Sequence, residues 1–226
     1  MLVCGPAAAT QKPDKIAITP SSKDGALMLR ATRLPIEYEL AITRYDPAEQ
    51  ALGGGIGSGY ADVVIKPAIA FARVDLASDF VMRSARPGTY VLRAVSQQAY
   101  WSVCFAEASL YFTVRPGEVV VIGDFDGATP VAELHGNVMA NPSHRRVQQG
   151  TIHAYLDNIS PPKLTAADAP MLAAATARLR VNSPKTMVAP TVATLETGKF
   201  GTGYTLFGQK AYGAFFKKKV AKTAAQ

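Results

Sequence analysis

The stretch Leu34–Asp46, LPIEYELAITRYD, carries the clearest structural signal in the chain. Its side chains alternate between apolar and more polar positions. The apolar set is Ile36, Tyr38, Leu40 and Ile42, and the set between them is Glu37, Glu39, Ala41 and Thr43. Successive side chains of a strand point to opposite faces, so a period of two indicates β structure. The stretch predicts a strand with one buried face and one face in water.

Short runs of similar character occur on both sides of this stretch. They occupy residues 26–33, 61–65, 68–75, 80–84, 89–96, 100–105, 110–114 and 118–125, with a weaker strand candidate at 131–138. Turn-forming triplets such as Arg86-Pro87-Gly88 and Arg115-Pro116-Gly117 separate several of them. No helical periodicity interrupts the series. The sequence therefore predicts a mainly β fold, an antiparallel β-sandwich of about eight short strands.

The chain divides into five segments by composition. Residues 164–182 predict a C-terminal α-helix, because Thr165 and Asp168 form a capping signature and Pro170 lies in or near the first turn. The predicted division is an N-terminal segment (1–25), a β-sandwich domain (26–138), a linker or excursion (139–163), the helix (164–182) and an extended basic, aromatic tail (183–226).

The net charge of +7 at pH 7 is concentrated at the end of the chain. Six lysines and no acidic residue occur from Lys199 onwards, which leaves 18 basic and 17 acidic residues before it. A nucleic-acid-binding domain would carry its basic excess on the folded body. Nucleic acid is therefore not expected as a partner.

The glycine-rich stretch at 53–59 resembles a phosphate-binding loop only superficially. In the dinucleotide-binding spacing the third glycine would fall on Ser58, and in the P-loop spacing Tyr60 stands where lysine is required. The residues that follow predict a strand rather than the helix that would bind phosphate. The stretch predicts a flexible connection between strands, and no cofactor is expected.

The sequence GDFDG contains two weak candidates for metal ligands. Asp124 and Asp126 lie on one side of a predicted strand end, where both carboxylates could share a cation. The following residues, Ala128, Thr129 and Pro130, lack the oxygen ligands that a calcium loop supplies at fixed intervals. We therefore expect a turn built from aspartate and glycine rather than a metal site, and no motif predicts a catalytic residue.

The N-terminus is consistent with more than one role. Residues 2–9 are apolar and small and turn abruptly polar, as at the end of a secretory signal, but the basic start of such a signal is missing. Cys4 could carry a lipid, form a disulfide with Cys104 or remain a free thiol. The residue before a lipidated cysteine is normally small, and Val3 fits that pattern poorly.

The C-terminal tail interleaves aromatic and basic residues. The candidate contact residues for a membrane or a partner are Tyr212, Phe215, Phe216, Lys217, Lys218 and Lys219. Such a stretch could lie on an anionic membrane surface, where aromatic rings and lysines both contribute to binding. It could equally contact a protein partner or a second copy of the chain. The simplest alternative is a last strand followed by a solvated end.

Two motifs give residues 81–126 a family resemblance. Pro87–Leu92, PGTYVL, follows one tight turn, and Phe112–Val120, FTVRPGEVV, spans another. The segment resembles a loose group of uncharacterised bacterial cell-envelope proteins, lipoproteins among them. The resemblance implies a β-sandwich in the periplasm or at the outer membrane with no known catalysis.

Residues and resemblance together lead to two hypotheses about function. The first is a non-catalytic cell-envelope protein that acts as a structural or interaction module, as a subunit of a larger assembly. The second is a hydrolase or carbohydrate-binding protein whose site assembles in space from residues far apart in the sequence.

Overall fold

The computed structural model describes most of the predicted strand region and the segment after it. The described residues are 15–31, 33–35, 38–52, 63–65, 80–97, 101–105, 108–140, 153–155, 161–199, 202–204 and 210–212. The strand predicted at 68–75 and the glycine-rich stretch at 53–59 lie outside these ranges.

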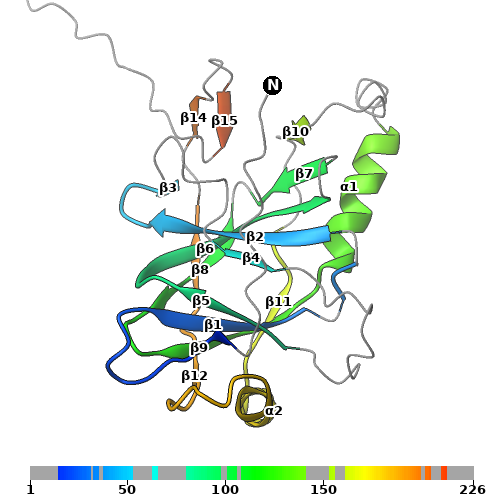
Figure 1. Cartoon of the computed structure of the whole chain (residues 1–226). Helices are drawn as coiled ribbons and strands as arrows, with labels where there is room; N and C mark the ends of the chain where they lie inside the picture. Colours follow the sequence, from blue (N-terminus) through cyan, green and yellow to red (C-terminus); the bar gives the residue numbers. More distant parts are fainter. Residues whose placement is uncertain are drawn as a thin grey trace, which may run out of the picture.

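The described part of the chain is mainly β, as the sequence predicted, and most of its strands form two sheets (Figure 1). The first sheet has five strands: β1 (Gly25–Arg30), β5 (Phe80–Ala85), β9 (Val119–Phe125), β11 (Leu164–Ala166) and β12 (Thr191–Val192). The second sheet has eight: β2 (Tyr38–Asp46), β3 (Ala51–Leu52), β4 (Val63–Ile65), β6 (Gly88–Gln97), β7 (Trp101–Cys104), β8 (Ser109–Val114), β10 (His153–Tyr155) and β13 (Glu196–Gly198).

The sheets are mixed, and the prediction of a purely antiparallel arrangement is wrong. β9 runs parallel to β1 and to β12, and β10 runs parallel to β7. A parallel neighbour requires a crossover connection. Between β1 and β9 the chain forms strands of the second sheet and then returns to the first. This long connection lets β9 lie beside β1 in the same direction.

Buried side chains fill three regions of the fold. One cluster joins the two sheets and includes Leu27, Leu40 and Phe112. A second lies between the other face of the first sheet and helix α2 (Ala169–Asn182), and it includes Met28 and Leu179. Both faces of the first sheet are thus buried, which explains why β1 and β9 read as nearly continuous apolar runs.

The third buried region corrects the prediction that β2 has one face in water. It contains Tyr45, Leu52 and Val91, and it lies on the second face of the second sheet. Thr43, which the alternation predicts on the wet face, is only 1% exposed, and Tyr45 further along the strand is only 6% exposed. Part of the cover comes from Gly198, where an added Cβ would lie 3.0 Å from the rings of Tyr45 and Tyr111.

Both helices differ from the sequence-based prediction. The weak strand candidate at 131–138 is wrong, because these residues belong to helix α1 (Ala128–Ala140). Pro130 fits there because the first residues of a helix have no intrahelical N–H partner. Helix α2 begins after the predicted start, since residues 164–166 form strand β11. Asp168 caps it by accepting a hydrogen bond from the Met171 N–H at 2.8 Å, so Thr165 is not the cap.

Residues 183–199, expected to belong to an extended tail, add strands to both sheets. β12 pairs with β9 in the first sheet, and β13 pairs with β8 in the second. Further along, β14 (Thr202–Tyr204) and β15 (Lys210–Tyr212) form an antiparallel pair. In Figure 1 this pair lies at the end of the molecule opposite α2.

Gly123 in β9 allows the close approach of β11, and its replacement tests that packing. Its φ of +145° is one that other residues rarely adopt, and a Cβ would collide with the Thr165 carbonyl oxygen. We expect Gly123→Ala to lower the free energy of unfolding by about 2–4 kcal/mol, measured by urea denaturation.

Gly136→Ala is the matched control, because no heavy atom lies within 4 Å of the Cβ it would add in α1. This variant is expected to gain up to about 1 kcal/mol from the higher helix propensity of alanine. Equal unfolding midpoints for wild type and Gly123→Ala would contradict the close packing of β11 on β9.

Candidate functional site

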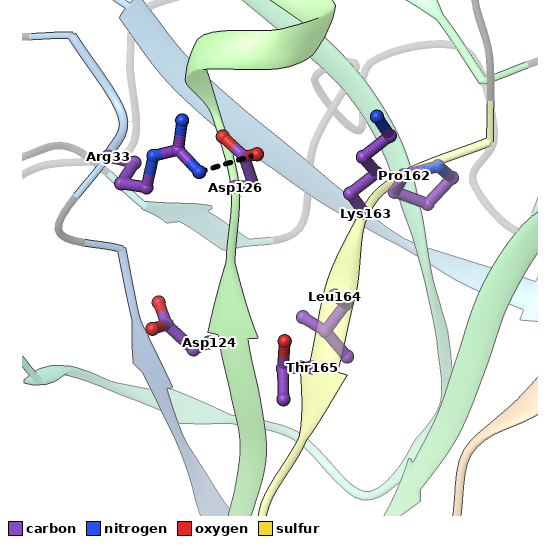
Figure 2. Close-up of a pocket in the computed structure, with 7 residues that line it drawn as sticks. All are labelled: Arg33, Asp124, Asp126, Pro162, Lys163, Leu164 and Thr165. Carbon is purple, nitrogen blue, oxygen red and sulfur yellow. Dashed lines mark hydrogen bonds and ion pairs between the residues drawn. The ribbon is translucent and has the colours of Figure 1, made fainter.

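An open, polar depression lies where β9 ends beside β11. It has a volume of about 460 Å³ and is lined by Arg33, Asp124, Asp126, Pro162, Lys163, Leu164 and Thr165. Figure 2 shows these residues, with the aspartates on the β9 side, Leu164 and Thr165 on the neighbouring strand β11, and Lys163 just before that strand. Both predicted metal-ligand candidates therefore lie in one place.

The strand pairing determines which side chains reach the depression. Thr165 is the register partner of Asp124, and Leu164 that of Phe125. The Asp126 N–H continues the pairing by donating to the Lys163 carbonyl oxygen at 2.9 Å. β9 and β11 therefore hold the lining residues in a fixed relation to one another.

Asp126 holds the start of helix α1 in place. Its Oδ1 accepts hydrogen bonds from the Ala128 N–H at 3.1 Å and the Thr129 N–H at 3.4 Å, and its Oδ2 accepts one from the Thr129 hydroxyl at 3.0 Å. Arg33 Nη1 lies 3.0 Å from the same Oδ2. Burial by itself would raise the pKa of Asp126. The bonds from Thr129 and Ala128, together with Arg33, outweigh burial and bring this pKa below its ordinary value.

Asp124 has a different cationic neighbour. Its Oδ2 lies 3.8 Å from Arg30 Nε, and the two residues are register partners in β9 and β1. In Figure 2 the carboxylate of Asp126 faces Arg33, whereas that of Asp124 points elsewhere. Within the described ranges, no group of three or more His, Cys, Asp or Glu side chains is placed to hold a metal ion. The hypothesis of a shared cation gains no support from this arrangement, because each carboxylate has an arginine beside it.

A second polar cluster lies at the other sheet, where the chain leaves β13. The Tyr45 hydroxyl donates to the Lys199 carbonyl oxygen at 2.7 Å, and the Tyr111 hydroxyl donates to Glu196 Oε2 at 2.6 Å. The two tyrosine rings lie 5.4 Å apart between centroids. Burial, only partly offset by the bond to Lys199, raises the pKa of Tyr45. The hydrogen bond to Glu196 raises the pKa of Tyr111.

Most of the other residues that the sequence singled out lie outside the described ranges. These are Cys4, Phe215, Phe216, Lys217, Lys218 and Lys219. Tyr212 is described as the last residue of β15, where it pairs with Thr202. Sequence reasoning missed Arg30, Arg33 and Lys163, because no local pattern connects these cations with aspartates about 40 to 100 positions away.

Neither helix in the described part of the chain is long and apolar enough to cross a bilayer. Comparison of the chain with protein-family models, with curated proteins and with solved structures found no match.

Replacing Asp126 tests its role at the start of α1. Asp126→Ala should lower the free energy of unfolding at pH 7 by about 1–2 kcal/mol, because the first helical N–H groups lose their acceptor. A carboxylate whose pKa is lowered by folding stabilises the fold above its unfolded pKa of about 3.9, and it loses that effect as pH falls through the folded pKa. The difference between variant and wild type should therefore shrink below about pH 4, as measured by urea denaturation at several pH values.

Arg33→Gln separates the ion pair from the helix contacts. The Arg33 side chain is 64% exposed, so its contribution should be below about 1 kcal/mol. A loss on Arg33→Gln as large as that on Asp126→Ala would contradict the assignment of the main role to the helix contacts.

Proposed function

We propose that this protein is a non-catalytic module of the bacterial cell envelope, in the periplasm or associated with the outer membrane. In this proposal the two sheets form a β-sandwich that acts as a structural or interaction subunit. The PGTYVL and FTVRPGEVV motifs support the location through their resemblance to envelope proteins. The buried cluster that contains Leu27 and Leu29 of one sheet and Leu40 and Ile42 of the other supports the sandwich.

The observation that carries the interaction role is the fixed start of the basic C-terminal stretch. β13 pairs with β8, and Tyr45 binds the Lys199 carbonyl oxygen. Five lysines follow after residue 199, with no acidic residue among them. A chemically distinct segment thus begins at a defined point on a folded body, which suits a segment that contacts a partner.

The chemistry of that segment limits its partners. Tyr212, Phe215 and Phe216 offer aromatic surface next to Lys217, Lys218 and Lys219. Aromatic residues are enriched at the cores of protein interfaces, and lysines bind anionic surfaces. A protein partner, a second copy of the chain and an anionic membrane all fit this chemistry. Nucleic acid fits less well, since the rest of the chain carries almost no basic excess.

The alternative function is a hydrolase or carbohydrate-binding protein. The residues of the polar depression support this alternative less than they support the interaction module. An acid–base pair needs two carboxylates that share a substrate and differ in their environment. Here the Asp126 carboxylate accepts hydrogen bonds from the first residues of α1 and forms an ion pair with Arg33. The Asp124 carboxylate lies beside Arg30. We therefore favour the interaction module.

Removal of residues 200–226 tests the proposal. The truncated protein keeps Lys199 and its bond to Tyr45, so its unfolding midpoint should match that of the full chain. We expect the full chain to self-associate or to sediment with anionic vesicles, and the truncated protein to lose that association. The expected loss is at least about a hundredfold, since Lys217, Lys218 and Lys219 alone would contribute about 1 kcal/mol each near an anionic surface. Sedimentation velocity and vesicle pelleting are the two measurements.

Two full-length variants separate charge from aromatic contact. Lys217→Gln, Lys218→Gln and Lys219→Gln together remove charge, whereas Phe215→Ala with Phe216→Ala removes aromatic surface. Identical behaviour of the truncated protein and the full chain in both assays would refute a role of this segment in association.

A further inference from the structure

The large hydrophobic residues that the described part of the chain leaves exposed all fall within one short stretch. They are Val181 at 70% exposure, Met187 at 78% and Val192 at 43%. Val181 lies in the last turn of α2, and Met187 follows a turn in which the Thr186 N–H donates to the Ser183 carbonyl oxygen. We call Val181, Met187 and the basic residues Arg178, Arg180 and Lys185 the α2-end surface.

The backbone under this surface is held by buried contacts. The Ser183 N–H donates to the Leu179 carbonyl oxygen, and its fully buried hydroxyl lies 3.4 Å from Met82 Sδ. The Met187 N–H donates to the Ile18 carbonyl oxygen at 2.8 Å, and Thr186 Oγ1 lies 3.2 Å from the Ile16 carbonyl oxygen. Val181 and Met187 are therefore presented to solvent on a fixed backbone.

The charge of the same stretch has one sign. Residues 169–195 contain Arg178, Arg180 and Lys185 and no acidic residue. Arg180 and Lys185 are exposed and Arg178 is half-buried. The nearest sequence neighbours with carboxylates are both engaged elsewhere: Asp168 caps the far end of α2, and Glu196 accepts from Tyr111. Glu118, which reaches Thr191 at 3.2 Å, also lies 3.9 Å from Arg115.

We infer that the α2-end surface docks on an anionic lipid surface, with Val181 and Met187 entering the interface and Arg180 and Lys185 lying at the level of the headgroups. Exposed apolar residues rimmed by polar ones mark protein or membrane contact sites. A second copy of the chain would bring like charges together, which opposes self-association through this surface. Two protruding apolar side chains are too few for the desolvated core of a standard protein interface, but they suit shallow insertion at a membrane.

This inference rests on the proposed envelope location, and it assigns the lipid contact to a different part of the chain from the C-terminal segment. Figure 1 places α2 at one end of the molecule and the β14–β15 pair at the other. The C-terminal segment would then be available to a protein partner while the α2-end surface lies on lipid.

The test uses full-length protein and sedimentation with vesicles of phosphatidylglycerol and phosphatidylcholine, compared with pure phosphatidylcholine. Val181→Ser with Met187→Ser keeps the charge and should weaken binding to the anionic vesicles about tenfold. Arg180→Glu with Lys185→Glu keeps the apolar side chains and should weaken it about thirtyfold or more. Arg86→Glu, an exposed arginine in the turn between β5 and β6, is the control and should change binding less than about threefold.

The outcomes distinguish this inference from the proposed function. Wild-type affinity in both double variants, or a full chain that fails to sediment with anionic vesicles, overturns the inference. If truncation after Lys199 abolishes vesicle binding and the double variants do not, the lipid contact lies in the C-terminal segment, so the inference fails and the proposed function stands. If the double variants lose binding and truncation changes neither assay, the inference stands and the role proposed for the C-terminal segment fails.

Discussion

Every residue from Val119 to Ile122 in β9 is buried, because this strand has neighbours on both faces and along both edges. Val120 and Ile122 face the cluster shared with the second sheet, whereas Val119 and Val121 face α2. One edge pairs with β1 and the other with β11 and β12. A strand enclosed in this way accepts charged side chains most readily towards its end, where the cover on its faces stops. The carboxylates of Asp124 and Asp126, and with them the polar depression, therefore occur at its end.

Two of the connections between the sheets involve β8 and β9. The turn after β8 carries the chain directly from the second sheet into β9 of the first, and residues 191–198 then run back across both, since β12 pairs with β9 and β13 with β8. The second link brings together strands that lie more than 60 positions apart in the sequence, so local sequence alone cannot specify it. The position of Lys199, and hence the start of the basic stretch, is consequently a property of the folded molecule and not of its local sequence.

Local patterns located most strands, because a period of two depends only on neighbouring residues. The cover over Tyr45 could not be predicted in this way, since Gly198 comes from a distant part of the chain. Helix α1 was mistaken for a strand because Gly136 weakens its helical signal and Asp126 resembles an ordinary turn residue, although its side chain binds the first helical N–H groups. The two aspartates were found as a local motif. Their arginines were not, because each ion pair joins residues more than 90 positions apart in the sequence.

The α2-end surface shows two kinds of residue with separate tasks in one short stretch. Ser183 and Thr186 are small and polar, and they attach the turn to the body through buried or half-buried hydrogen bonds. The side chains of Met187 and Val181 contribute little to that attachment, since most of each remains in water. Polar residues at these two positions would preserve the hydrogen bonds that attach the turn and would avoid exposing apolar surface. Apolar side chains on such a fixed turn, beside cations alone, gain free energy only when something outside the fold removes them from water.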